Sequence, residues 1–213
     1  MNKDLYRQNI LTFYNAEAQL RDSRSVKADW KVFVRDKFLK AVQTENKKTL
    51  LELGAGPGHD SLFFVENGLK VTAVDLSEKM TEKCREKGLE AYALDFYDLS
   101  SLNKRYSCVY AINTLLHVPK EDLCHVLHQI NLVLEADGLF YMGLYGGQDT
   151  QSEYVISEIS DAPRYFVFHS AQYLTSVLSQ TFIILDFLTL NVGTGGVQAP
   201  GDIFHSVTMR KKA

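Results

Sequence analysis

Along most of the chain, segments whose apolar residues recur at helical spacing alternate with short apolar or alternating runs. This pattern predicts alternating helices and strands. Short apolar, β-branched runs are typical of strands buried in a parallel sheet. The expected strands are 48–53, 69–75, 90–95, 106–113 and 138–144, and the expected helices are 4–20, 26–43, 59–67, 78–87 and 120–134. Alternation of this kind favours right-handed crossovers and a parallel sheet with helices on both faces.

The C-terminal third has a different pattern. Residues 146–168 lack helical periodicity, and a short helix is expected at about 170–179. Two further strands are predicted at Thr181–Leu190 and Asp202–Lys211, joined by the glycine-rich segment Asn191–Gly201. Because no helix separates these two strands, we expect them to pair antiparallel.

Three glycines follow the first predicted strand at alternate positions, Gly54, Gly56 and Gly58. Glycine lets the backbone turn sharply and approach a ligand where a Cβ would collide. The helix predicted directly after them would turn its N-terminal amides toward a nucleotide-like ligand.

The next two strands each end near an acid. Asp75 lies about twenty residues past the glycines, the separation at which a carboxylate reaches the ribose hydroxyls of a nucleotide cofactor. Asp95-Phe96 follows the third strand, where an acid beside an aromatic ring suits an adenine. A dinucleotide-binding fingerprint would require glycine at position 59, and the chain has His59 there.

The pattern Glu52-x-Gly54-x-Gly56-x-Gly58 resembles the first motif of class I S-adenosylmethionine (AdoMet)-dependent methyltransferases. Asp75, Asp95-Phe96, the strand 108–113 and Gly138–Met142 lie where the later motifs of that family lie. The resemblance covers about residues 48–145. It implies an α/β fold with one Rossmann-like, doubly wound, seven-stranded sheet of order 3-2-1-4-5-7-6, in which strand 7 is antiparallel.

We therefore expect one methyltransferase domain over residues 1–213, with AdoMet as cofactor and S-adenosylhomocysteine as product. Residues 1–45 would form an N-terminal helical cover, 48–145 the AdoMet-binding core, and 146–213 a substrate-side insertion followed by the antiparallel strands. Within these parts, 1–30 and 146–168 are expected to close over the substrate, with Gly146-Gly147 as a hinge.

The resemblance implies a set of cofactor-binding residues at the strand ends. Glu52 would hold the ammonium group of AdoMet, although a salt bridge to a Lys or Arg is an alternative for a buried acid. Core packing is an equal alternative for Leu76 and Met80, and Ser77 is the better helix N-cap beside Asp75. The complete set is Glu52, Gly54, Ala55, Gly56, Gly58, Asp75, Leu76, Met80, Asp95, Phe96, Asn113, Thr114 and Leu115.

His117 is the most attractive general base in the chain, because imidazole exchanges a proton near neutral pH. Packing beside the cofactor is the alternative for this residue. His125 and His128 stand three apart on one predicted helix, but no third ligand lies near them, and we expect no metal.

Aromatic and arginine residues outside the motif-bearing core are the substrate-side candidates. An arginine among aromatic rings suits an anionic or planar substrate, whereas a turn packed on the core is the alternative for the later segment. The candidates are Tyr6, Tyr14, Trp30, Arg164 and Tyr165.

Charge and cysteine content narrow the class of partner. The net charge is −3, so no overall basic field favours nucleic acid or an anionic membrane, although residues 1–48 carry eleven Lys/Arg against six Asp/Glu. Three cysteines (Cys84, Cys108 and Cys124) form no disulfide or zinc pattern, and a cytoplasmic location is expected. No apolar run is long enough to span a membrane.

The sequence thus favours methyl transfer to a soluble small molecule. A methyltransferase acting on RNA or protein, and a non-catalytic AdoMet- or dinucleotide-binding module, are the alternatives. The acceptor atom and the oligomeric state are not predicted.

Overall fold

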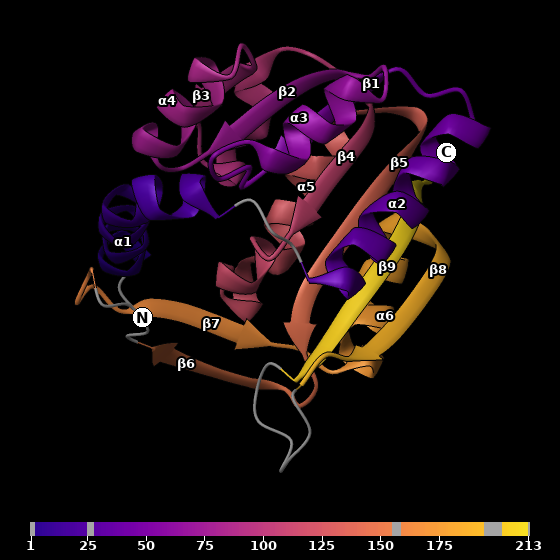
Figure 1. Ribbon diagram of the computed structural model, residues 1–213. Coiled ribbons are helices and arrows are strands. Elements are labelled where there is room, and N and C mark those ends of the chain that lie inside the picture. The colour runs from indigo at the N-terminus through magenta and orange to yellow at the C-terminus, as the bar shows by residue number, and fades with distance from the viewer. Residues whose placement is uncertain (1–2, 25–27, 155–158, 194–201, 213) are drawn as a thin grey trace.

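One twisted sheet forms the centre of the computed structural model, which describes residues 3–24, 28–154, 159–193 and 202–212 (Figure 1). Seven strands follow the order β3-β2-β1-β4-β5-β9-β8. Their bounds are β1 Thr49–Leu53, β2 Lys70–Asp75, β3 Glu90–Ala93, β4 Tyr106–Ile112, β5 Leu134–Gly146, β8 Phe182–Asn191 and β9 Ile203–Lys211. The first five strands run parallel, so their carboxyl ends meet at one edge of the sheet.

Helices cover both faces of this sheet. They are α1 Lys3–Ser23, α2 Asp29–Thr44, α3 His59–Glu66, α4 Glu78–Glu86, α5 Leu123–Val133 and α6 Ala171–Thr181, with 3₁₀ turns η1 Phe96–Leu102, η2 Leu115–His117 and η3 Lys120–Asp122. On one face α2 and α3 bury Val34, Phe38 and Phe64. On the other, α5 and α6 bury residues such as Ile130 and Leu178.

The predicted fold class is confirmed, because β9 lies antiparallel between β5 and β8. Val207 of β9 faces Met142 on one side and Phe187 on the other. Two strands that lie between β5 and β8 in the described chain, β6 Thr150–Tyr154 and β7 Arg164–Phe168, are not part of this sheet. For that reason β9 and β8 correspond to strands 7 and 6 of the expected order. Much of the expected connection Asn191–Gly201, from 194 onward, lies outside the described residues.

Residues 146–168 differ from the sequence-based expectation, since they include a two-stranded antiparallel hairpin. Its strands are β6 Thr150–Tyr154 and β7 Arg164–Phe168. Tyr165 and Val167, two positions apart on β7, pack together against Tyr6 and Ile10 of α1. Alternate residues of a strand share a face, so the hairpin offers α1 one apolar surface.

Helix α1 therefore lies beside β7, near the edge where the parallel strands end (Figure 1). Helix α2 is different, because most of its apolar side is buried on the sheet. Of the expected cover 1–45, α1 and the first residues of α2 reach the region above the strand ends. None of the helices in the described ranges is long and apolar enough to cross a membrane.

Candidate active site

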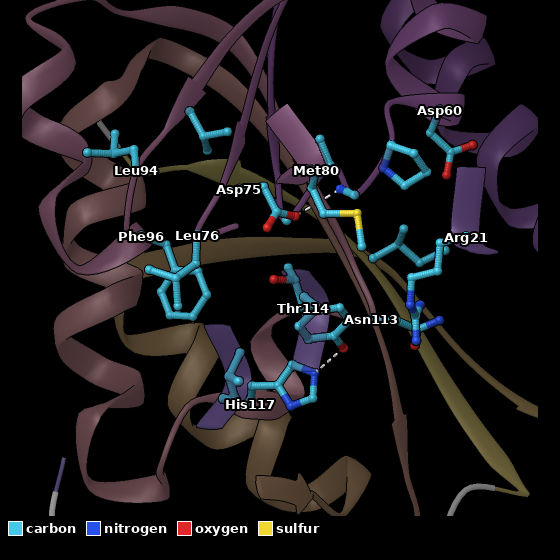
Figure 2. A pocket seen from close by; sticks show the side chains of 18 of the residues that line it. Arg21, Asp60, Asp75, Leu76, Met80, Leu94, Phe96, Asn113, Thr114 and His117 are labelled. Atoms are coloured by element: carbon cyan, nitrogen blue, oxygen red, sulfur yellow. Dashed lines mark hydrogen bonds between the residues drawn. The ribbon is translucent and has the colours of Figure 1, made fainter. Parts of the chain in front are cut away.

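A cavity of about 380 Å³ opens at the carboxyl ends of the parallel strands. Its walls come from the glycine turn after β1, from the residues that follow β2, β3 and β4, and from α1. Figure 2 shows Asp75, Asn113 and His117 around this common space. Ten of the thirteen predicted cofactor residues line it, namely Gly54, Ala55, Gly56, Asp75, Leu76, Met80, Asp95, Phe96, Asn113 and Thr114.

The turn after β1 needs glycine at its first position for two reasons. Gly54 has φ +62°, a left-handed conformation that other residues rarely adopt. A Cβ there would lie 2.2 Å from Oγ1 of Thr114, the residue that follows β4 by two positions. Thus the absence of a side chain at position 54 lets two strand ends approach each other at the cavity wall.

Asp75 links the glycine turn to the end of β2. Its Oδ2 accepts a hydrogen bond from the Gly56 amide (2.9 Å), and its Oδ1 accepts one from the Ser77 amide (2.9 Å). Burial raises the pKa of the Asp75 carboxyl, and the two amide bonds and the charge of Arg21 oppose that rise. A carboxylate accepts about four hydrogen bonds, so Asp75 keeps acceptor capacity toward the cavity. Ser77 caps α4 by accepting the Met80 amide (3.1 Å), as predicted.

Asp95 follows β3 and begins the 3₁₀ turn η1. Its Oδ1 accepts the Tyr97 amide (3.0 Å), which explains why β3 ends at Ala93 rather than at residue 95. Its Oδ2 pairs with the guanidinium of Arg7 from α1, which also lies 4.5 Å from the centre of the Tyr97 ring. The N-terminal helix is thereby tied to the third strand end.

Asn113 supplies an unused acceptor at the end of β4. Its backbone is left-handed (φ +52°), and its amide donates to the Gly143 carbonyl at 2.7 Å. The side-chain Oδ1 is buried without a hydrogen-bond partner in the described chain, although the residue lines the cavity. A buried unpaired acceptor costs about 1–3 kcal/mol, so this atom is suited to a ligand that donates a hydrogen bond.

Three predicted cofactor residues lie behind the cavity wall rather than on it. Glu52 is 2% exposed and accepts a hydrogen bond on Oε2 from the Ser61 hydroxyl of α3. Gly58 packs against α4 and the residues after it, where a Cβ would meet Cys84 of the helix and Leu89. Leu115 is buried in the core with the residues of α5.

Of the five substrate-side candidates, Tyr6 and Tyr14 line the cavity. Trp30 instead packs on Phe204 of β9, with ring centres 4.5 Å apart. Arg164 is buried, and its guanidinium lies 4.1 Å from the centre of the Phe13 ring. The Tyr165 ring packs on Tyr6. Arg164 and Tyr165 therefore support α1 from behind, whereas Trp30 packs α2 onto the sheet.

His117 lies at the inner end of the cavity and bonds through both ring nitrogens. Nδ1 is 2.7 Å from the Tyr165 carbonyl oxygen, and Nε2 is 2.7 Å from the Tyr14 hydroxyl. Burial lowers the pKa of the imidazole to about 4, and the charges of Arg164 and Arg21 act in the same direction. His117 is therefore neutral at physiological pH.

Several cavity residues were not predicted from the sequence, and they include Arg7, Ile10 and Arg21 on α1 and Tyr97 beside it. Tyr97 donates to Asp122 (3.0 Å) and accepts from Tyr6 (2.9 Å), and burial raises its pKa. The helical spacing of Tyr6, Ile10 and Tyr14 could have indicated the inward face of α1.

The described residues form no set of metal ligands. Within these ranges no group of three or more His, Cys, Asp or Glu side chains is placed to hold a metal ion. His125 and His128 are both exposed on α5.

Comparison with known proteins supports the reading of the strand-end motifs. Residues 50–138 match the family model described as a methyltransferase domain. No curated protein sequence matches the chain.

Solved structures resemble the whole chain. Burkholderia thailandensis 1,6-didemethyltoxoflavin-N1-methyltransferase aligns with a TM-score of 0.74 at 18% identity, over 100% of this chain and 92% of that one. The CcbJ methyltransferase from Streptomyces caelestis gives 0.70 at 17% identity, over 95% and 98%. Magnesium protoporphyrin IX methyltransferase from Synechocystis gives 0.68 at 13% identity, over 100% of both chains.

At such low identity these likenesses show a shared fold, while the matched domain model covers the cofactor half from β1 to the start of β5. Together with the glycine turn and the acids at the ends of β2 and β3, they show a methyltransferase domain carried on the fold of the class I AdoMet-dependent methyltransferases.

Proposed function

We propose that this methyltransferase transfers the methyl group of AdoMet to a small, soluble acceptor with a planar or aromatic surface. The observation that supports this most is the composition of the cavity at the strand ends. Strand-end motif residues form one wall, and Tyr6, Ile10 and Tyr14 of α1 form the opposite one. Its volume of about 380 Å³ is typical of small-molecule sites, roughly 300–1,000 Å³.

The cavity residues fit the cofactor by their chemistry. Asp75 would accept the ribose hydroxyls, and Asp95 with Phe96 would bind the adenine. The unpaired Asn113 Oδ1 and the bare backbone of Gly54 and Gly56 leave a polar cradle for the methionine part. When bound, AdoMet supplies an activated methyl group on a positively charged sulfur.

Two opposite charges, one on the cavity lining and one behind its wall, suit the amino-acid end of the cofactor. Arg21, at the C-terminal end of α1, lines the cavity and would attract its carboxylate. Glu52, buried one layer behind the glycine turn, would favour the ammonium group through an intervening hydrogen bond.

The acceptor side of the proposed site is aromatic. Tyr6, Tyr14 and Tyr97 all line the cavity and offer flat surfaces for stacking. Two of the similar solved structures are named for methylation of 1,6-didemethyltoxoflavin and of magnesium protoporphyrin IX, both small molecules. We propose the same class of acceptor, a small molecule, for this chain. We do not propose either of the two compounds.

In this proposal the protein contributes mainly alignment and exclusion of water. Helix α1 lies over the strand ends, and its contacts with β7 keep the aromatic wall in place. Holding two reactants in line can supply roughly 7–11 kcal/mol of the barrier. No covalent enzyme intermediate is needed for such a displacement.

A reducing compartment such as the cytoplasm is part of the proposal. All three cysteines are free thiols, and burial raises the pKa of both Cys84 and Cys108 to about 12. Neither buried thiol is then suited to ready disulfide exchange.

A labelled-cofactor screen tests the proposed function. The purified protein is incubated with methyl-labelled AdoMet and pooled metabolites, and in parallel with RNA and with cell protein, using Asp75→Ala as the negative control. We expect label to enter only the metabolite fraction, and we expect Asp75→Ala to incorporate far less label than the wild-type protein when AdoMet is supplied below the wild-type Kd. Label confined to RNA or protein would reject the small-molecule acceptor.

A further inference from the structure

The hydrogen bonds around His117 have a fixed direction. A carbonyl oxygen only accepts, so the Tyr165 carbonyl 2.7 Å from Nδ1 requires that Nδ1 carries the proton. The low pKa of this buried ring, about 4, means that Nε2 then has a free lone pair. The Tyr14 hydroxyl, 2.7 Å from Nε2, must therefore donate its proton to it.

This direction decides what Tyr14 offers the cavity. Its proton is engaged by His117, so its oxygen has lone pairs but no hydrogen to give. Tyr14 lines the cavity and is only partly buried, whereas His117 behind it is 5% exposed. A molecule bound beside Tyr14 thus meets a hydrogen-bond acceptor.

Packing holds the two rings in this relation. The Phe166 ring of β7 contacts His117 edge-on, with ring centres 4.8 Å apart. The charged groups that act on the imidazole are Arg164, seated between Phe13 and Phe166, and Arg21, whose guanidinium lies 4.9 Å from the centre of the Tyr14 ring. Arg21 also pairs with Glu17. Both arginine charges disfavour a resting imidazolium.

We propose that Tyr14 is a catalytic residue that accepts the proton of the methyl acceptor and relays its own proton to His117. The acceptor class is then a protic nucleophile, an O–H or N–H group, rather than a thioether, tertiary amine or carbon lacking such a proton. This inference rests on the proposed function and names the acceptor chemistry of the same site.

The step balances in atoms and electrons. A lone pair of the acceptor O or N forms the new bond to the methyl carbon, and the carbon–sulfur bond breaks with its electron pair going to sulfur. The acceptor proton moves to Tyr14 Oη while the Tyr14 proton moves to His117 Nε2. The products are the methylated acceptor, the neutral thioether and an imidazolium bonded to the Tyr165 carbonyl. Because the pKa of His117 is low, this imidazolium returns its proton to solvent readily once the product leaves.

Nitrogen NMR tests the resting geometry without any acceptor. In the full-length protein with ¹⁵N-labelled histidine and S-adenosylhomocysteine, His117 is identified by the signals missing in His117→Gln. We expect the tautomer protonated on Nδ1, still neutral at pH 5.5, and a shift of the Nε2 signal in Tyr14→Phe. Tyr92→Phe, an exposed tyrosine outside the cavity, should leave the signal unchanged. A proton on Nε2 would overturn the proposal.

Kinetics with an acceptor from the labelled-cofactor screen test the relay. Glutamine at position 117 can replace both hydrogen bonds but cannot take up a proton, so His117→Gln separates positioning from proton transfer. We expect Tyr14→Phe and His117→Gln each to lower kcat by about 10²–10⁴-fold, the usual contribution of general acid–base catalysis. The affinity for S-adenosylhomocysteine should stay within about threefold.

The outcomes separate this inference from the function on which it rests. Turnover by Tyr14→Phe or by His117→Gln within threefold of wild type rejects the relay, even though the protein is a methyltransferase. A wild-type protein that binds no S-adenosylhomocysteine rejects the proposed function, whatever the tautomer of His117. An acceptor without any O–H or N–H at the methylated atom also rejects the relay.

Discussion

Asp75 shows how one side chain at a strand end serves both fold and site. It accepts the Gly56 and Ser77 amides, and so it joins the glycine turn to the N-terminus of α4 while facing the cavity. Burial of a carboxylate is unfavourable unless hydrogen bonds compensate it, and here two amides do so. Ribose hydroxyls would complete the set.

Replacing Asp75 with Ala should therefore weaken binding of S-adenosylhomocysteine. The loss of charge-assisted hydrogen bonds is expected to cost about 1.5–3 kcal/mol, or roughly 10- to 150-fold in Kd. Isothermal titration calorimetry measures it, with Asp98→Ala, an exposed acid of η1, as the matched control. Equal affinity in the two variants would remove Asp75 from the ribose site.

Buried His117 makes the stability of the fold depend on pH. Its pKa is about 4 in the folded chain and about 6.5 when unfolded, so between these values the unfolded state binds more protons. The free energy of unfolding should then fall as pH drops from about 6.5 toward 4, by up to about 1.4 kcal/mol per unit and per histidine. His169, whose pKa burial also lowers to about 4, adds a similar contribution.

Urea unfolding at pH 7, 6 and 5 measures this slope. The His117→Gln variant should show a shallower fall with decreasing pH than wild type, by about one proton. His128→Gln, at an exposed position of α5, should keep the wild-type slope. A His117→Gln slope equal to that of wild type would mean that the native imidazole is accessible to protons.

Most strand-end residues of the site could be predicted because parallel strands bring their carboxyl ends to one edge. The positions of Asp75 and Asp95 could be predicted from the ends of the second and third strands and from their distance along the chain from the glycine turn. Arg7 and Tyr97 could not be found in this way, since their contact depends on where α1 docks. Arg164 was expected to face the substrate. Its guanidinium instead lies against the Phe13 ring and is buried, a contact that depends on where α1 docks.

Among the elements, α1 and β7 act as a pair over the cavity. Tyr6 and Ile10 pack on Tyr165 and Val167, and the Arg164 guanidinium lies against Phe13, which is fully buried. Sequence periodicity predicted α1 but not the hairpin. The β6 segment Thr150–Tyr154 is polar and has no apolar alternation of its own, so its pairing depends on β7.

The Arg164→Ala change should loosen α1 without unfolding the sheet. Loss of the contact with Phe13 removes a cation–π interaction of about 1–2 kcal/mol, which corresponds to roughly 5- to 30-fold faster hydrogen exchange. We expect this in α1 amides only, measured by mass spectrometry with exposed Arg85→Ala as control. Faster exchange in β4 and β5 but not in α1 would show that Arg164 stabilises the core instead.

At the scale of the whole molecule, two features of the sequence predicted the strand directions, while the resemblance to methyltransferases implied the order of the strands in the sheet. Alternating strands and helices indicated the parallel part, and the absence of a helix between the last two strands indicated the antiparallel reversal that β8 and β9 show. The same order places the glycine turn, Asp75 and Asp95 on neighbouring strands β1, β2 and β3. Packing of α1 against the hairpin then turns this edge into a cavity.

Calorimetric titration of the wild-type chain with S-adenosylhomocysteine, and separately with NADH, tests the central claim most directly. Both ligands contain adenosine, but the strand-end motifs match those of enzymes that bind the first. His59 stands where the dinucleotide fingerprint requires glycine, which disfavours NADH. We predict one S-adenosylhomocysteine bound per chain, with a Kd in the micromolar range or below, and no heat of binding with NADH. Binding of NADH without binding of S-adenosylhomocysteine would contradict the account.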